Sequence, residues 1–158
     1  HPNNFPGVVI SAPTVVIPKG TTQTTIISAK VLSKIAPKLG MMQVDPFGVS
    51  SDPQVVKDYI NDPLVYHGKS PVRFMAESLK AILRINDKYE SITQPLLIVS
   101  GSEDALADPK GSKLLFEEVG SSDKTLKIYE GFHHEVFNEP MHETVLSDVE
   151  SWIADRLS

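Results

Sequence analysis

The chain has 158 residues and a formal net charge of −5, with 41% hydrophobic and 22% charged residues. This balance is typical of one soluble-type globular domain. The negative charge and the lack of a Lys/Arg cluster argue against a nucleic-acid partner. The sequence has no cysteine, which excludes disulfides and thiol chemistry, and no apolar run is long enough to span a bilayer.

The first predicted element is a short β-branched run. Residues 7–11 (Gly-Val-Val-Ile-Ser) lie between Pro6 and Pro13, which predicts a strand buried on both faces, as in a parallel sheet. Two prolines and a glycine make 14–20 a connection. Apolar residues at helical spacing then predict a helix over 24–38.

That helix carries an apolar stripe formed by Ile27, Val31 and Ile35. Such a stripe more often packs on its own domain, but it can also face lipid or an acyl chain. Periodicity alone does not separate the two. Met41 and Met42 follow and add apolar surface, which suits the mouth of a site for an apolar substrate.

Two similar pairs mark the next helix starts. Asp52-Pro53 offers an N-cap with proline at the first helical position and predicts a short helix through Tyr59. Ser70-Pro71 repeats this signal, and apolar residues at helical intervals follow it: Val72, Met75, Leu79, Ile82 and Leu83.

Strand and helix patterns alternate in the last part of the chain. Apolar runs predict strands at 96–100 and 125–129, and helices are predicted around 114–119 and 145–157. This alternation is typical of a parallel sheet with right-handed crossover helices.

We therefore predict an α/β fold in two parts. Residues 1–13 and 91–158 form the sheet with its helices, while residues 14–90 hold several helices and no convincing strand. The economical interpretation is a helical insertion, or cap, over the carboxyl ends of the strands, where ligand sites of α/β proteins lie.

Two polar residues follow the later strands. Asp104 comes shortly after the run at 96–100, and His134 comes just past the run at 125–129. An imidazole titrates near neutral pH and can act as a general base, and a carboxylate bonded to its other nitrogen fixes its tautomer. This order suits the last two members of a Ser-Asp-His triad. The Gly-x-Ser-x-Gly elbow that would precede them is absent from the 158 residues.

Several motifs together carry a family resemblance along nearly the whole chain. The chain resembles the C-terminal half of the monoacylglycerol lipase branch of the serine α/β-hydrolase superfamily, including its cap. The matching segments are Gly7–Pro13, Asn61–Gly68 (Asn-Asp-Pro-Leu-Val-Tyr-His-Gly), Gly101–Asp104 with Asp108, Lys124–Gly131, and His134–Glu139 (His-Glu-Val-Phe-Asn-Glu).

This resemblance implies a fold, an activity and two site residues. It implies the C-terminal part of an α/β-hydrolase fold with a helical cap insertion, in which Asp104 is the triad acid and His134 the general base. The nucleophile elbow and the oxyanion-hole segment of the family have no counterpart here, so we expect the nucleophile to lie upstream. We also expect the isolated chain to be inactive.

The implied reaction converts a monoacylglycerol and water to a fatty acid and glycerol, without metal or cofactor. Alternatives are a lysophospholipase or another carboxylesterase of the same family, or a catalytically silent hydrolase-like module that binds an apolar ligand or a partner. The expected partners are a lipid ester and the N-terminal half of the hydrolase. The expected location is the cytoplasm, with peripheral membrane contact through the cap.

Some neighbouring residues have competing interpretations. His133 occupies a place where many family members have an aromatic residue, so the choice between His133 and His134 needs a structure. Asp108 precedes Pro109 and suits an N-cap, and Ser102 lies beside the acid, where its hydroxyl should serve the turn. His67 and His142 carry no motif, which favours structural roles.

Overall fold

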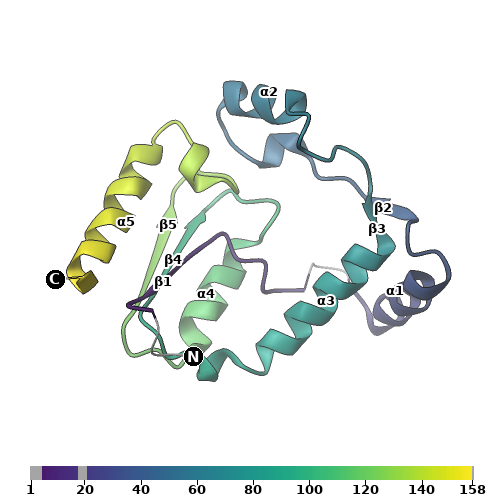
Figure 1. Cartoon of the computed structure of the whole chain (residues 1–158), viewed down its shortest axis with the longest axis horizontal. Helices are drawn as coiled ribbons and strands as arrows, with labels where there is room; N and C mark the ends of the chain where they lie inside the picture. Colours follow the sequence, from purple (N-terminus) through teal and green to yellow (C-terminus); the bar gives the residue numbers. More distant parts are fainter. Residues whose placement is uncertain (1–4, 18–20, 158) are drawn as a thin grey trace.

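A three-stranded parallel sheet lies in one half of the computed structural model, which describes residues 5–17 and 21–157 (Figure 1). The strands are β1 (Val8–Ser11), β4 (Leu96–Gly101) and β5 (Lys124–Tyr129), in the order β1-β4-β5. Val8 of β1 pairs with Leu96 of β4, which in turn pairs with Lys124 of β5. The three predicted parallel strands are confirmed to within one residue at each end.

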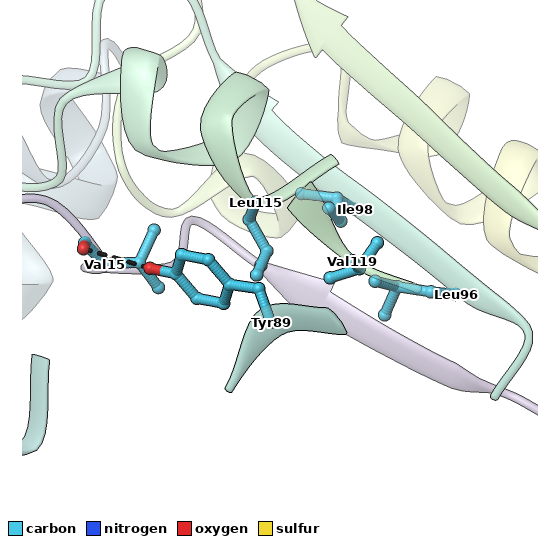
Figure 2. Close-up of a cluster of buried hydrophobic side chains, with 6 residues drawn as sticks. All are labelled: Val15, Tyr89, Leu96, Ile98, Leu115 and Val119. Carbon is cyan, nitrogen blue, oxygen red and sulfur yellow. Dashed lines mark hydrogen bonds between the residues drawn. The ribbon is translucent and has the colours of Figure 1, made fainter. Parts of the chain in front are cut away.

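Helices cover both faces of β4, whose six residues are all buried. On one face, Leu96 and Ile98 pack against Leu115 of α4 (Pro109–Glu118) and against Tyr89, whose hydroxyl donates to the carbonyl of Val15 (Figure 2). On the other face, Leu97 and Val99 pack with Val145 and Trp152 of α5 (His142–Leu157). The core therefore consists of two clusters separated by the central strand.

The strand β1 lies at one edge of the sheet. Its first three residues are half-buried and Ser11 is exposed, so the predicted burial on both faces is wrong. Within the described ranges, 5–17 and 21–157, β1 pairs with β4 alone and its outer backbone edge has no strand partner. An apolar edge strand is a liability, because its unpaired backbone N–H and C=O groups can pair with another chain.

Residues 12–95 connect β1 to β4 and are called the inserted region below. The described part of this region is largely helical (Figure 1). Part of the predicted connection at 14–20 lies outside the described residues. The elements that follow are α1 (Gln23–Ile35), β2 (Gly40–Met42), η2 (Pro46–Gly48), α2 (Pro53–Asn61), β3 (Ser70–Pro71), α3 (Val72–Asn86) and η3 (Tyr89–Ser91). As predicted, Asp52 caps α2 by accepting a hydrogen bond from the backbone N–H of Gln54 at 2.7 Å.

Two local predictions for this region are wrong. The expectation that it holds no strand fails, because β2 and β3 form a short antiparallel pair. Ser70 does not cap α3; Pro71 occupies the N-cap position without a side-chain hydrogen bond. Ser70 lies in β3 instead, and the helix begins one residue later than predicted because Pro71 itself has the extended backbone of an N-cap, with φ −62° and ψ 145°.

The helix α1 ends at Ile35 rather than at residue 38, and it buries a different face from the one its stripe suggests. Ile26 and Ser33 are its buried residues, on the side that packs against α3. The stripe itself is turned outward: Ile27, Val31 and Ile35 are 59%, 52% and 76% exposed. Packing of the stripe against its own domain is therefore not what the structure shows.

Candidate active site

The carboxylate of Asp104 lies just beyond the carboxyl end of β4, and its side chain is fully buried. Its Oδ1 accepts hydrogen bonds from the backbone N–H groups of Leu106 and Ala107, both at 2.8 Å. These two bonds fix the carboxylate in one orientation and leave Oδ2 for another partner. A buried carboxylate needs such donors, because desolvation of an unpaired charge is costly.

The partner of Oδ2 is His134, which lies beyond the carboxyl end of the neighbouring strand β5. Its Nδ1 is 2.9 Å from Oδ2 of Asp104. The hydrogen bond to Asp104 raises the pKa of His134; burial opposes this shift, and the charges of Asp104 and Glu135 reinforce it. The ring is about one-third exposed, so it stays reachable from outside. This arrangement can hold a proton and return it, as a general base requires.

The structure distinguishes the two adjacent histidines. The ring of His133 does not contact Asp104; its Nδ1 lies 3.1 Å from the carbonyl oxygen of Phe47. Its backbone N–H donates to Oε1 of Glu139 at 2.7 Å. Only His134 of the pair therefore has the geometry of a carboxylate-oriented imidazole.

A glycine brings the ends of β4 and β5 close enough for this contact. A Cβ at Gly101 would lie 2.1 Å from the carbonyl oxygen of Phe132, closer than any side chain permits. The backbone N–H of Glu103 donates to that same oxygen at 2.9 Å. The hydroxyl of Ser102 accepts from the backbone N–H of Gly131 at 2.9 Å, so the predicted role of Ser102 in the turn is confirmed.

The other polar residues that the sequence singled out have local structural contacts. Asp108 caps α4 by accepting from the N–H of Lys110 at 3.0 Å, as predicted. His67 packs edge-on against Tyr59, and Nδ1 of His142 lies 2.8 Å from the carbonyl oxygen of Glu139. Among the described residues, no cluster of three His, Cys, Asp or Glu side chains could hold a metal ion.

A hydrophobic groove of about 320 Å³ lies between α1 and α3, apart from this site. Neither Asp104 nor His134 lines it. Its floor contains Ile26, Ala29, Leu79 and Leu83, with Lys30, Lys80 and Arg84 also in the lining. The groove therefore belongs to the packing of the two helices rather than to the Asp-His pair.

Sequence reasoning missed the structural importance of Glu139. This residue is 1% exposed, and its carboxylate accepts hydrogen bonds from the backbone of His133 and from Ser51. Its position in His-Glu-Val-Phe-Asn-Glu was noted only as part of a motif. The partner Ser51 is 88 residues away, so no local pattern could have revealed the contact.

Comparison with known proteins fits this geometry. The family model described as Hydrolase_4, serine aminopeptidase S33, matches residues 1–141. The chain belongs to this family. A monoacylglycerol lipase from Mycolicibacterium smegmatis is 40% identical over 99% of the chain, and the human monoglyceride lipase is 34% identical over 99%. The match covers 56% and 52% of those relatives, so the chain spans about half the length of the curated relatives it matches.

A solved structure supports the same assignment. The crystal structure of Paleococcus ferrophilus monoacylglycerol lipase superposes with a TM-score of 0.86 at 32% identity. The superposition covers 98% of this chain and 61% of that chain. The predicted fold class, the C-terminal part of an α/β-hydrolase, is therefore confirmed, as is the resemblance to monoacylglycerol lipases.

Proposed function

We propose that this chain is the part of a serine ester hydrolase that supplies the triad acid, Asp104, and the triad base, His134. The observation that carries the proposal is the 2.9 Å contact between His134 Nδ1 and a buried carboxylate oriented by two backbone donors. Both residues follow the carboxyl ends of adjacent parallel strands, where α/β enzymes place their sites. The nucleophilic serine and the oxyanion hole would come from the part of the protein upstream of residue 1.

The proposed reaction assigns one task to each residue. Nε2 of His134 takes the proton of the upstream serine as its oxygen attacks the ester carbonyl. His134 then returns that proton to the alcohol oxygen that leaves, and the cycle repeats with water to release the acid. Asp104 keeps the Nδ1 proton in place and stabilises the imidazolium that forms between these steps.

A monoacylglycerol is the proposed substrate, because the relatives that match the whole chain carry that activity in their names. In this proposal residues 14–90 form a cap around the acyl chain, whose burial contributes about 0.8 kcal/mol per methylene. Lysophospholipase or other carboxylesterase activity is the alternative, since the Asp-His pair acts on any ester carbonyl. A silent binding module is the alternative outside enzymes, and it predicts no reactive serine in the complete protein.

The same proposal includes contact with a lipid surface. The outward side chains of Ile27, Val31 and Ile35 lie on α1, and Met41 and Met42 of β2 are each more than half exposed. Such apolar patches on soluble surfaces mark interaction sites. No helix in residues 5–17 and 21–157 is long and apolar enough to cross a membrane. The proposed contact is peripheral, through the exposed side chains of α1 and β2, and the cytoplasmic location stays a prediction.

A fluorophosphonate probe with an ester panel tests the function. We expect the complete protein to be labelled and to hydrolyse long-chain monoacylglycerols with a higher kcat/KM than acetyl esters or amino-acid anilides. The purified 158-residue chain should not be labelled, because loss of even one oxyanion donor typically costs about 10²–10³ in rate. Labelling of this chain that disappears in Ser102→Ala would overturn the assignment, and a complete protein that is never labelled would favour the binding module.

A further inference from the structure

The loop of His134 is held by the inserted region rather than by the sheet alone. The backbone N–H of His134 donates to the carbonyl of Gly48 at 3.3 Å, and that of Glu135 donates to Val49 at 2.8 Å. In the other direction, the hydroxyl of Ser50 donates to the carbonyl of Asn138 at 3.0 Å. Several hydrogen bonds therefore join residues 47–51 to residues 133–139.

Glu139 is the side chain at the centre of this contact. Its Oε1 accepts from the backbone N–H of His133 at 2.7 Å and from that of Ser51 at 3.0 Å. Its Oε2 accepts from the hydroxyl of Ser51. One carboxylate therefore ties the residue next to His134 to the inserted region.

Burial of the Glu139 carboxylate costs free energy, which is unusual for a contact that only joins two segments. Glu139 is 1% exposed, and no cation forms an ion pair with it within residues 5–17 and 21–157. Burial of a carboxylate without a counter-charge is unfavourable, and hydrogen bonds to an ionised acceptor offset it only when the donors are fixed. Here three donors from Ser51 and His133 hold the carboxylate in one place, which suits a role in placing the loop.

We propose that Glu139 is a positioning residue, which fixes the loop of His134 against residues 47–51 so that the imidazole meets both Asp104 and the substrate. The proposal rests on the hydrolase function proposed above. A shift of about 1 Å in a reacting group can cost about 10²-fold in rate. Movement of residues 47–51 would, by the same bonds, change the position of the base.

The test compares three variants of the complete hydrolase. Glu139→Gln keeps the volume and one acceptor but loses the charge, Ser51→Ala removes one donor to Oε2, and Glu150→Gln makes the same charge change on the exposed side of α5. For each variant, kcat and KM for a short soluble ester are measured per site titrated by the fluorophosphonate. The NMR signal of the proton between His134 and Asp104 is recorded alongside.

We expect Glu139→Gln to lower kcat by about tenfold to a hundredfold with KM within about twofold, and to move or broaden the His134 proton signal. Ser51→Ala should show a smaller loss in the same direction, and Glu150→Gln none. If Glu139→Gln lowers only the melting temperature, with kcat per site and the proton signal as in Glu150→Gln, the role is structural and the proposal fails. If Glu139→Gln does not fold, an unchanged kcat and proton signal in Ser51→Ala overturns it equally.

Failure of the proposed function would look different. A wild-type complete protein that is neither labelled nor active would contradict the hydrolase assignment. The His134 proton signal would still decide whether Glu139 positions that ring, because it needs no turnover.

Discussion

β4 and α1 are both rich in aliphatic side chains, but those of β4 are buried and several of those of α1 are exposed. Every residue of β4 is buried between α4 and α5, and Ile98 and Val99 have no exposed surface. On α1, by contrast, Ile27 and Ile35 keep well over half of their surface exposed. The apolar side chains of β4 are buried by helices of this chain. On α1, only the face that packs against α3 is buried.

This difference in burial indicates that β4 contributes to the stability of the fold and that the exposed face of α1 is available for interaction. The aliphatic side chains of β4 at positions 96–99 stabilise the fold, each by roughly 1.5–3 kcal/mol relative to an exposed position. The exposed side chains of α1 contribute little to folding and are available to another surface. Substitutions in the two regions should therefore change different measured quantities, and the following experiments test that separation.

The largest effect is expected at the acid in the sheet region. Asp104→Asn in the complete protein should lower kcat for ester hydrolysis by about 10⁴, because the amide no longer fixes the His134 tautomer or stabilises the imidazolium. Steady-state kinetics with circular dichroism as a folding check measures this. Asp108→Asn, which preserves an N-cap acceptor on α4, is the control and should stay close to wild type. Equal losses in both variants would remove Asp104 from the mechanism.

The next effect concerns α1 and lipid. Replacement of Ile27, Val31 and Ile35 by Ser should weaken binding of the complete protein to phospholipid vesicles by at least about tenfold, since several partly exposed apolar side chains no longer enter the lipid. Turnover of a soluble short ester should not change. Vesicle sedimentation measures the partition.

A matched triple on α5 provides the control for this experiment. Leu146, Ile153 and Leu157 are 44%, 39% and 68% exposed, and their replacement by Ser should leave vesicle binding unchanged. If both triples weaken binding equally, the exposed stripe of α1 has no special role and the comparison between the two regions fails.

A smaller effect is expected where β4 meets the histidine loop. Gly101→Ala should destabilise the protein by about 1–3 kcal/mol, because its Cβ would overlap the carbonyl of Phe132 and push the loop away. Gly131→Ala should cost about 1–2 kcal/mol for another reason, its φ of +75°. Urea denaturation compares the stability of the two variants. Only Gly101→Ala should also disturb the His134–Asp104 contact and so lower kcat. Unchanged kinetics in Gly101→Ala would contradict the close approach between Gly101 and Phe132.

The smallest expected effect is on pH dependence. The pKa of His134 is raised above its ordinary value of about 6.5, chiefly by the hydrogen bond to Asp104, so activity should rise with pH through a value above 6.5. The stability that His134 contributes has the opposite trend: it is fully present below the unfolded pKa and lost as pH rises through the folded pKa. Glu135→Gln should shift the acid limb of the pH profile of kcat/KM to lower pH, because the charge of Glu135 also raises the pKa of His134. An upward move would contradict that electrostatic account.

The sequence predicted the sheet well because its signals are local. The runs at 96–100 and 125–129 are continuous and bounded by turn residues, and parallel pairing follows from the helix between them. The face of α1 was not predictable in the same way. Its stripe has correct helical periodicity, but which side meets α3 depends on a contact some fifty residues away in the chain, and Ile26 rather than Ile27 makes it.

The candidate site divides along the same line. The contact between Asp104 and His134 was predictable, because each residue comes shortly after the end of a strand and because the motif around them resembles a known family. The choice of His134 over His133 needed coordinates, since adjacent residues in a loop point in different directions. Glu139 was beyond prediction, because its value as an acceptor depends on donors from Ser51 that only the tertiary fold brings near.

The route of α3 limits how this molecule can be re-engineered by exchange of segments. The inserted region leaves the sheet at the carboxyl end of β1 and re-enters at the amino end of the neighbouring strand β4, so its two attachment points lie at opposite ends of the strands (Figure 1). The 15 residues of α3 span about 22 Å, close to the roughly 20 Å of the six-residue β4. A chimera that takes its insertion from a relative should therefore keep α3 and join the foreign segment before Val72, because a graft ending elsewhere must bridge the full height of the sheet.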